Sequence, residues 1–282
     1  MRQKTGFIII VCIVLSGCSA TRLLYNQLDW GVVWYLNGFF SLSGEQKGAL
    51  RESVERNLEW HRKTQLPQYA EFARALDQDI AGEITVEMLD QRNIEIIGFW
   101  DAFVLHTVSD VAAFFLLLDQ EQNDEFLEKL EDENHELWDE YAGETPEERI
   151  ERRERSAIKA IRRVMGGLDD DQKELIRSYM GRMIDVSDEW MAGRRLWQKN
   201  FVELVKSRPP EPFFSDRLVD LMLDPNQFDS PGYRDKVEKN RWLMLEMMTD
   251  LINRMNDEQR DRFSKRLQMY ARDFDLLSVQ DE

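Results

Sequence analysis

A histidine and a carboxylate four positions apart are the side chains of this sequence best placed for acid–base chemistry. On a helix, His106 and Asp110 would share one face, because residues four apart are neighbours on a helix surface. A buried pair of this type can move a proton at a catalytic site. A structural pair inside a core is the commoner case, and the sequence leaves both interpretations open.

Trp60, His61 and Arg62 form a second candidate, either a recognition patch or a structural corner. They come shortly before Pro67, where a proline is expected to end or kink a helix. The remaining histidine, His135, lies among acidic residues. The sequence has no HExxH motif, no Ser/His/Asp ordering, no glycine-rich phosphate loop and no metal-ligand spacing. We therefore predict no catalytic residue, no metal, no cofactor and no enzymatic activity.

Cys18 points to a different chemistry, the covalent attachment of lipid. A positive start is followed by an apolar run over 7–15, which is far shorter than the roughly 20 residues that a bilayer span needs. The run ends in Leu15-Ser16-Gly17-Cys18, which resembles the lipobox of bacterial lipoproteins. The resemblance implies that residues 1–17 are a signal peptide and that Cys18 carries the acyl chains that anchor the protein to a membrane.

The residue after the cysteine predicts which membrane that is. Ser19 stands where an Asp would be the inner-membrane retention signal, so the lipoprotein resemblance implies the periplasmic face of the outer membrane. Cys12 is removed with the signal peptide and Cys18 is used by the lipid. The mature chain therefore has no thiol left for a disulfide, a nucleophile or a metal site.

The charge of the chain excludes some partners. Acidic residues number 54 and basic residues 37, which gives a net charge of −17, and removal of Arg2 and Lys4 with the signal peptide makes it more negative. Such a chain repels nucleic acid and anionic headgroups. Because 43% of the residues are hydrophobic, the chain is predicted to fold despite this charge. Its expected partners are a membrane, through the lipid anchor, and envelope proteins.

Hydrophobic periodicity predicts an all-α protein. Apolar residues recur at spacings of three and four, alternating strand patterns are absent, and the prolines lie where helices should start or stop. We predict an elongated bundle of about nine helices. They are expected over 20–40, 43–65, 67–81, 85–117, 119–142, 145–166, 169–207, 230–254 and 256–277, with a short one over 215–223.

Two segments differ in character from the rest of the predicted bundle. Residues 18–41, the lipidated cysteine and an aromatic membrane-proximal helix, contain few charges, so this helix either lies at the bilayer interface or packs inward against the bundle of 42–282. The segment 96–118 is the most apolar of the mature chain. Because Asp101, His106 and Asp110 interrupt it, we interpret it as a core helix and not as a membrane span.

Four predicted helices open with the same capping pattern, in which an apolar residue and a cap are followed by a Gln three positions after the cap. The four sites are Leu42 to Gln46, Leu118 to Gln122, Leu168 to Gln172 and Met255 to Gln259. The pattern fits a capping box, in which the Gln side chain reaches back to the cap. It also resembles, more weakly, the LTxxQ motif of the Spy and CpxP type of periplasmic chaperones.

Charge is segregated between two adjacent segments. Fourteen acidic residues and one basic residue lie between Asp119 and Glu148, whereas seven basic and two acidic residues lie between Arg149 and Arg163. An antiparallel hairpin would place the segments side by side and neutralise both. The alternative is that the acidic segment is a docking surface for a basic partner.

Short motifs near the N-terminus resemble a known family. They are Thr21-Arg22, Leu24-Tyr25-Asn26, Leu28-Asp29-Trp30, Trp34-Tyr35-Leu36, Trp60-His61-Arg62, Leu66-Pro67 and Tyr69-Ala70. Together with the lipobox they look like a domain-of-unknown-function family of proteobacterial helical lipoproteins. Membership implies an envelope location and no established activity.

We predict an envelope lipoprotein that binds protein, either as a scaffold for a fixed partner or as a holdase for unfolded clients. The holdase hypothesis predicts exposed methionines, with Met244, Met247, Met248 and Met255 as candidates. The alternative is a hydrolase acting on cell wall or lipid. It predicts a deep pocket with His106 or His61 and converging carboxylates.

Overall fold

The computed structural model describes residues 18–225, 227 and 230–280, and within these the side chains of all residues except 18–21 and 139–142. The predicted signal peptide, residues 1–17, and the side chain of Cys18 lie outside the described part. Within that part every regular element is a helix, which confirms the all-α prediction.

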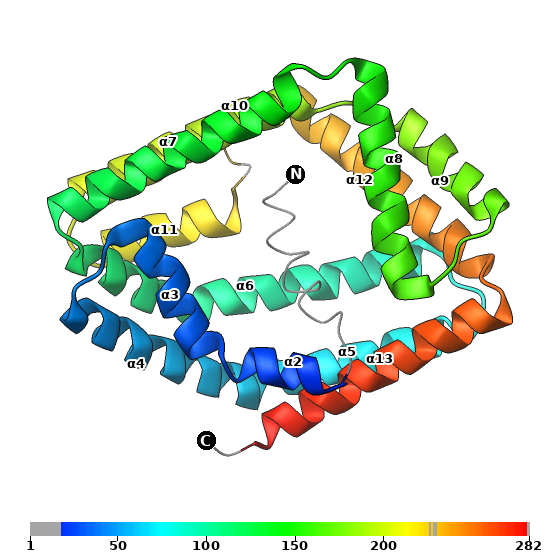
Figure 1. The fold of residues 1–282 in the computed structure, drawn as a ribbon, viewed down its shortest axis with the longest axis horizontal. Coiled ribbons are helices and arrows are strands. Elements are labelled where there is room, and N and C mark those ends of the chain that lie inside the picture. The colour runs from blue at the N-terminus through cyan, green and yellow to red at the C-terminus, as the bar shows by residue number, and fades with distance from the viewer. Residues whose placement is uncertain (1–17, 226, 228–229, 281–282) are drawn as a thin grey trace.

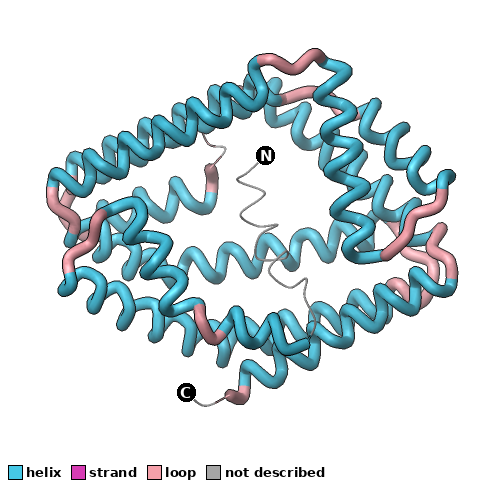
Figure 2. Tube along the Cα trace, viewed as in Figure 1, coloured by secondary structure: helices cyan, strands magenta, loops and turns pink. Residues whose placement is uncertain are grey.

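The helices form a frame around an open centre in the ribbon view, and one long helix, α6, crosses behind it (Figures 1 and 2). The elements are α2 (Cys18–Tyr25), α3 (Leu28–Phe40), α4 (Gly44–Trp60), a π-helical turn η1 (His61–Gln65), α5 (Leu66–Asp79), α6 (Val86–Leu117), α7 (Gln120–Ala142), α8 (Pro146–Met165), α9 (Asp170–Arg182), α10 (Ser187–Ser207), α11 (Phe213–Leu223), α12 (Pro231–Asn253) and α13 (Asp257–Ser278).

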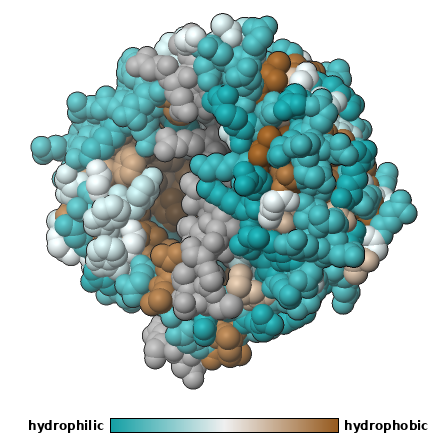
Figure 3. All heavy atoms as spheres, turned by 45° about the vertical axis from the view of Figure 1, so that its right-hand side comes forward, coloured by the Kyte–Doolittle hydropathy of each residue, from teal (hydrophilic) through white to brown (hydrophobic). Residues whose placement is uncertain are grey.

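Two hydrophobic cores hold the frame together. Core A joins α3, α4, the end of α6, the end of α10 and α11, and it includes Phe40, Phe115 and Phe214. Core B joins α5, α8, α9, α12 and α13, and it includes Met165 and Ile176. The space-filling view shows mainly hydrophilic side chains over the core B side, and a hollow in which hydrophobic side chains are visible (Figure 3).

Helix α6 bridges the two cores and is exposed between them. Its start packs on core B through Met88 and Leu89, and its end lies in core A. In its middle, Ile94, Ile97 and Leu105 are exposed. Among the described helices, α6 is long and apolar enough to span a bilayer, and only 28% of its apolar window is buried. The prediction of a core helix therefore holds for the second half of α6, where Val104, Val108 and Ala112 are buried, and not for its first half, which has no buried residue.

The four Gln-containing capping boxes meet in two pairs. In core A, Gln46 of α4 lies beside Gln122 of α7, and in core B, Gln172 of α9 lies beside Gln259 of α13. Each amide nitrogen donates to the partner's side-chain oxygen, at 2.8–2.9 Å. Each side-chain oxygen also accepts the N–H of its own cap residue, which confirms the capping boxes.

Each of these Gln amides also donates a hydrogen bond to a backbone oxygen in the segment just before the opposite helix. The acceptors are the backbone oxygens of Leu117, Ser41, Arg254 and Gly167, for Gln46, Gln122, Gln172 and Gln259 respectively. Both pairs therefore have the same two-fold symmetric pattern, in which every amide group is satisfied. The apolar residue ahead of each box is buried, at 1–8% exposure, in the adjoining core. Two helix starts are thereby tied together at each core.

The expected single helix over 169–207 is wrong, because the chain breaks between α9 and α10. The side chain of Asn240 on α12 binds both the N–H and the carbonyl of Ile184, at 2.8 Å each. Asp185 accepts a hydrogen bond from the N–H of Ser187 at 3.1 Å and so stabilises the start of α10. Contacts from other helices thus override the local helical pattern.

The break expected at Pro67 is replaced by the π-helical turn. A proline lacks the N–H of a helical residue and its ring clashes with the carbonyl four residues back. Here the N–H of Leu66 bonds to the carbonyl of His61, five residues back, so the turn is wider by one residue. Helices α4 and α5 therefore run on without a loop.

The charge-segregated hairpin is also wrong. Helix α7 packs on α3 and α10, whereas α8 packs on α9 and α13 (Figure 1). The basic helix finds its own acidic partner: Arg149 and Arg153 lie 2.9 and 3.5 Å from Asp185. Burial alone would raise the pKa of Asp185, but hydrogen bonds from Ser187 and Arg149 outweigh it and lower the pKa to about 2. The acidic helix is left without this neutralisation.

Candidate functional site

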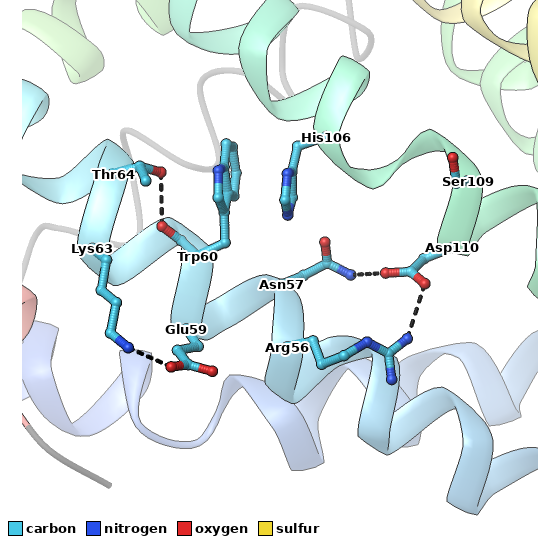
Figure 4. Close-up of a pocket in the computed structure, with 9 residues that line it drawn as sticks. All are labelled: Arg56, Asn57, Glu59, Trp60, Lys63, Thr64, His106, Ser109 and Asp110. Carbon is cyan, nitrogen blue, oxygen red and sulfur yellow. Dashed lines mark hydrogen bonds and ion pairs between the residues drawn. The ribbon is translucent and has the colours of Figure 1, made fainter.

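A pocket of about 520 Å³ lies between α4, η1 and α6 and contains both members of the predicted histidine–carboxylate pair (Figure 4). His106 and Asp110 do share one face of α6, as their spacing predicted. They do not form a buried pair, however. The Asp110 carboxylate accepts hydrogen bonds from Asn57 at 2.6 Å and from Arg56 at 3.0 Å, both on α4.

His106 is exposed and stacks on an aromatic ring. Its ring centroid lies 3.7 Å from that of Trp60, and the two planes are within 7° of each other. The nearby carboxylate of Glu59 is paired with Lys63. Among the described side chains, no carboxylate therefore bonds to His106 and orients it as a general base would require.

The Trp60-His61-Arg62 triplet is split between two environments. Trp60 lines the pocket, whereas His61 and Arg62 face α2. Nδ1 of His61 lies 2.9 Å from the Tyr25 hydroxyl, and Arg62 lies over the Tyr25 ring. Burial lowers the pKa of His61 to about 4, which favours the neutral ring as the acceptor of the tyrosine proton. Burial also raises the pKa of Tyr25, although the Arg62 charge opposes this.

A second contact fixes α2 to the body of the protein. Arg22 lies 3.6 Å from Asp273 on α13, and the Asp273 side chain is only 4% exposed. Burial raises the pKa of Asp273, and the nearby charges of Arg22 and Arg272 oppose that shift. This contact was not predicted from the sequence. The spacing of Arg22 and Tyr25, one helical turn apart, was the available sign that both face the same side.

The acidic helix α7 presents a row of carboxylates to solvent. This acidic ridge consists of Glu121, Asp124, Glu128, Asp132 and Glu136, which are all exposed and recur at spacings of three and four. None of them belongs to an ion pair within the described part of the chain, whereas Glu125 and Glu133 on the other face bind Lys129 and Arg194. The ridge is therefore a surface of uncompensated negative charge.

The methionines proposed as a client-binding surface are mostly inside the protein. Met247 and Met255 are 1% and 7% exposed in core B, and Met248 is partly buried against it. Met244 is exposed, at 41%. A flexible methionine surface for varied clients is therefore not present at these positions.

No group of three or more His, Cys, Asp or Glu side chains that could hold a metal ion occurs among the described residues.

Comparison with known proteins finds a match to a family model described as a family of unknown function, DUF6279, over residues 38–234. No curated protein and no solved structure matches. The similarity to the Spy and CpxP chaperones remains a prediction.

Proposed function

We propose that this chain, which belongs to the DUF6279 family of unknown function, is a lipid-anchored, non-enzymatic scaffold of the cell envelope. It is held by acyl chains on Cys18 at the periplasmic face of the outer membrane, and it binds a basic partner protein. The observation that carries this proposal is the acidic ridge of α7, which lacks the basic helix that the sequence pattern had suggested as its cover.

Fixed geometry supports a single partner more than varied clients. The ridge lies on a helix whose opposite face packs on α3 and α10, so its carboxylates keep a constant spacing along the helix. Such a row is suited to a complementary basic surface, because opposite charges steer association and set its register. A holdase for unfolded chains needs adaptable apolar surface instead, and Met247 and Met255 are buried.

The hydrolase alternative rests on His106 alone. The two carboxylates nearest to it in the pocket are bound by Arg56, Asn57 and Lys63. Activity would therefore require these contacts to open when substrate binds.

In-cell crosslinking tests the proposal. A photo-crosslinking amino acid placed at Glu128 on the ridge should capture one stoichiometric basic protein, and one placed at exposed Glu52 on α4 should not. Many captured proteins would support a holdase, and no captured protein at Glu128 would remove the scaffold proposal and favour the hydrolase.

A matched pair of variants measures the role of charge. Asp124→Asn/Glu128→Gln/Asp132→Asn keeps shape and removes three ridge charges, and it should weaken partner binding by roughly tenfold or more at low salt. Glu45→Gln/Glu52→Gln/Glu55→Gln removes three exposed charges from α4 and should leave binding unchanged. Equal losses in both variants would show that only net charge matters.

Lipid attachment is checked separately, by incorporation of labelled palmitate and its loss in Cys18→Ser.

A further inference from the structure

Helices α2 and α3 carry a neutral, apolar stripe on one side. Between them only Asn26 and Gln27 leave the helical pattern, and backbone bonds continue across the joint, from Asn26 to Arg22 and from Gly31 to Gln27. Exposed positions recur at spacings of three and four along both helices. The exposed large apolar side chains, here called the aromatic stripe, are Leu23, Leu24, Trp30, Trp34 and Tyr35, which are 47–65% exposed.

The opposite side of the same helices is fixed to the body. Val33 and Phe40 are buried in core A, and Arg22 and Tyr25 bind Asp273 and His61. The helices therefore cannot turn to hide the stripe without breaking these contacts. Trp30 and Trp34 also stack on each other, with centroids 6.2 Å apart, so these two rings form one aromatic surface within the stripe.

We propose that the aromatic stripe lies in the headgroup interface of the bilayer that holds the acyl chains of Cys18. This inference rests on the proposed lipidation and deepens it, because it adds a second membrane contact made by side chains. Helix α2 begins at Cys18 itself. At about 1.5 Å per residue, Leu23 lies only about 8 Å along the helix from the anchor. With no linker between the anchor and the body, the lipid holds this stripe at the membrane surface.

Side-chain chemistry identifies the occupant as lipid. Tryptophan and tyrosine favour the interface, because the apolar ring enters the acyl boundary while the polar edge stays wet. The stripe contains no carboxylate, in a protein whose net charge of −17 repels anionic headgroups elsewhere. The other exposed tryptophans differ in this respect: Trp138 lies on the acidic helix α7, and Trp242 donates a hydrogen bond to Glu238.

Spin labels give a direct test, because the mature chain has no cysteine except the acylated one. The acylated full-length protein is reconstituted in phosphatidylethanolamine and phosphatidylglycerol vesicles, with a nitroxide on Trp34→Cys or, as the matched control, on Trp138→Cys. The label at position 34 should collide mainly with oxygen dissolved in lipid, and the label at position 138 mainly with a water-soluble nickel complex.

Native tryptophan fluorescence provides a second measurement without labels. Brominated lipids should quench the wild-type chain, and Trp30→Phe/Trp34→Phe should lose most of that quenching. Trp138→Phe/Trp242→Phe should keep it. Circular dichroism of each variant checks that the helices are intact.

The outcomes separate the inference from the proposed lipidation. If mass spectrometry finds acylated Cys18 but the label at position 34 is open to the nickel complex, the stripe is not at the interface and the lipoprotein assignment stands. If Cys18 is not acylated, the lipidation fails first. If the label is shielded from both reagents and a photo-crosslinking amino acid at position 34 captures a second copy or another protein, the occupant is protein and the inference is wrong.

Discussion

The two glutamine pairs have the same hydrogen bonds but not the same surroundings. Gln46 and Gln122 tie α4 to α7 at core A, and Gln46 is only half-buried. Gln172 and Gln259 tie α9 to α13 at core B, where they are 2% and 4% exposed. The free-energy cost of losing a partner therefore differs between the two pairs, because water can replace a lost hydrogen bond at Gln46 and not at Gln172.

The pattern of hydrogen bonds alone therefore does not set their contribution to stability. Both pairs join helix starts through identical amide contacts, so a difference in stability between matched variants isolates the effect of burial. Four measurements test the role of burial, in decreasing order of the expected change in stability.

A charge in place of one buried amide should have the largest effect. Gln172→Glu removes both donors of the side chain and places an ionised carboxylate against the Gln259 oxygen, so unfolding should become easier by about 3–5 kcal/mol at neutral pH. Gln46→Glu should lose less than half of that, because water reaches the site. Urea unfolding followed by circular dichroism measures both. Equal losses would contradict the role assigned to burial.

Truncation of one amide should have an intermediate effect. Gln259→Ala leaves buried Gln172 without its side-chain partner and should destabilise the protein by about 2 kcal/mol. Gln122→Ala leaves half-buried Gln46 without its partner and should cost only about 1 kcal/mol, because water can replace the lost bond. The double variant Gln172→Ala/Gln259→Ala should be less harmful than the sum of its parts, because the pair acts as one unit. Additive losses would show that the two amides do not depend on each other.

Removal of a cap should affect both ends alike. Asp169 caps α9 at core B and Ser43 caps α4 at core A, and both are exposed. The side chain of each accepts a hydrogen bond from the backbone N–H of the Gln three residues later. Asp169→Ala and Ser43→Ala should each cost about 1 kcal/mol. A clear difference between them would mean that burial of the helix start, and not of the amide, distinguishes the ends.

A pH titration should give the smallest effect and should be independent of both pairs. The pKa of His61 is about 4 in the fold, below its ordinary value, so the unfolded chain binds more protons between those two pKa values. Stability therefore falls as the pH drops below about 6.5, by under about 1 kcal/mol between pH 7 and pH 6. His61→Asn keeps an acceptor for Tyr25 and should remove this component in urea unfolding, and Gln46→Ala should retain it.

The helices whose ends carry caps and prolines could be predicted from the sequence. Thr85 caps α6 and Pro146 begins α8, and both boundaries were predicted within one residue. The break before α10 could not, because Asn240 and Arg149 impose it from elsewhere in the chain. The pattern of positions is local information, whereas the identity of the packing partner is not.

The candidate site shows the same division. The spacing of His106 and Asp110 correctly placed them on one face of α6, but nothing local revealed that Arg56 and Asn57 would bind the carboxylate. The segregation of charge along 119–163 was visible in the sequence. Which core each helix packs on, and hence which charges remain uncovered, depends on contacts of α7 with α3 and of α8 with α13.

The π-helical turn at His61–Gln65 changes the helical phase between α4 and α5, which together form one continuous rod. One extra residue in a turn offsets the facing direction downstream by about 100°, since each residue of an α-helix advances by that angle. Before the turn the rod contacts α3 and α6, and after it the rod lies along α13. Deleting one residue here would rotate α5 out of phase with α13. The one extra residue therefore lets a single rod face α3 and α6 with its first half and α13 with its second half.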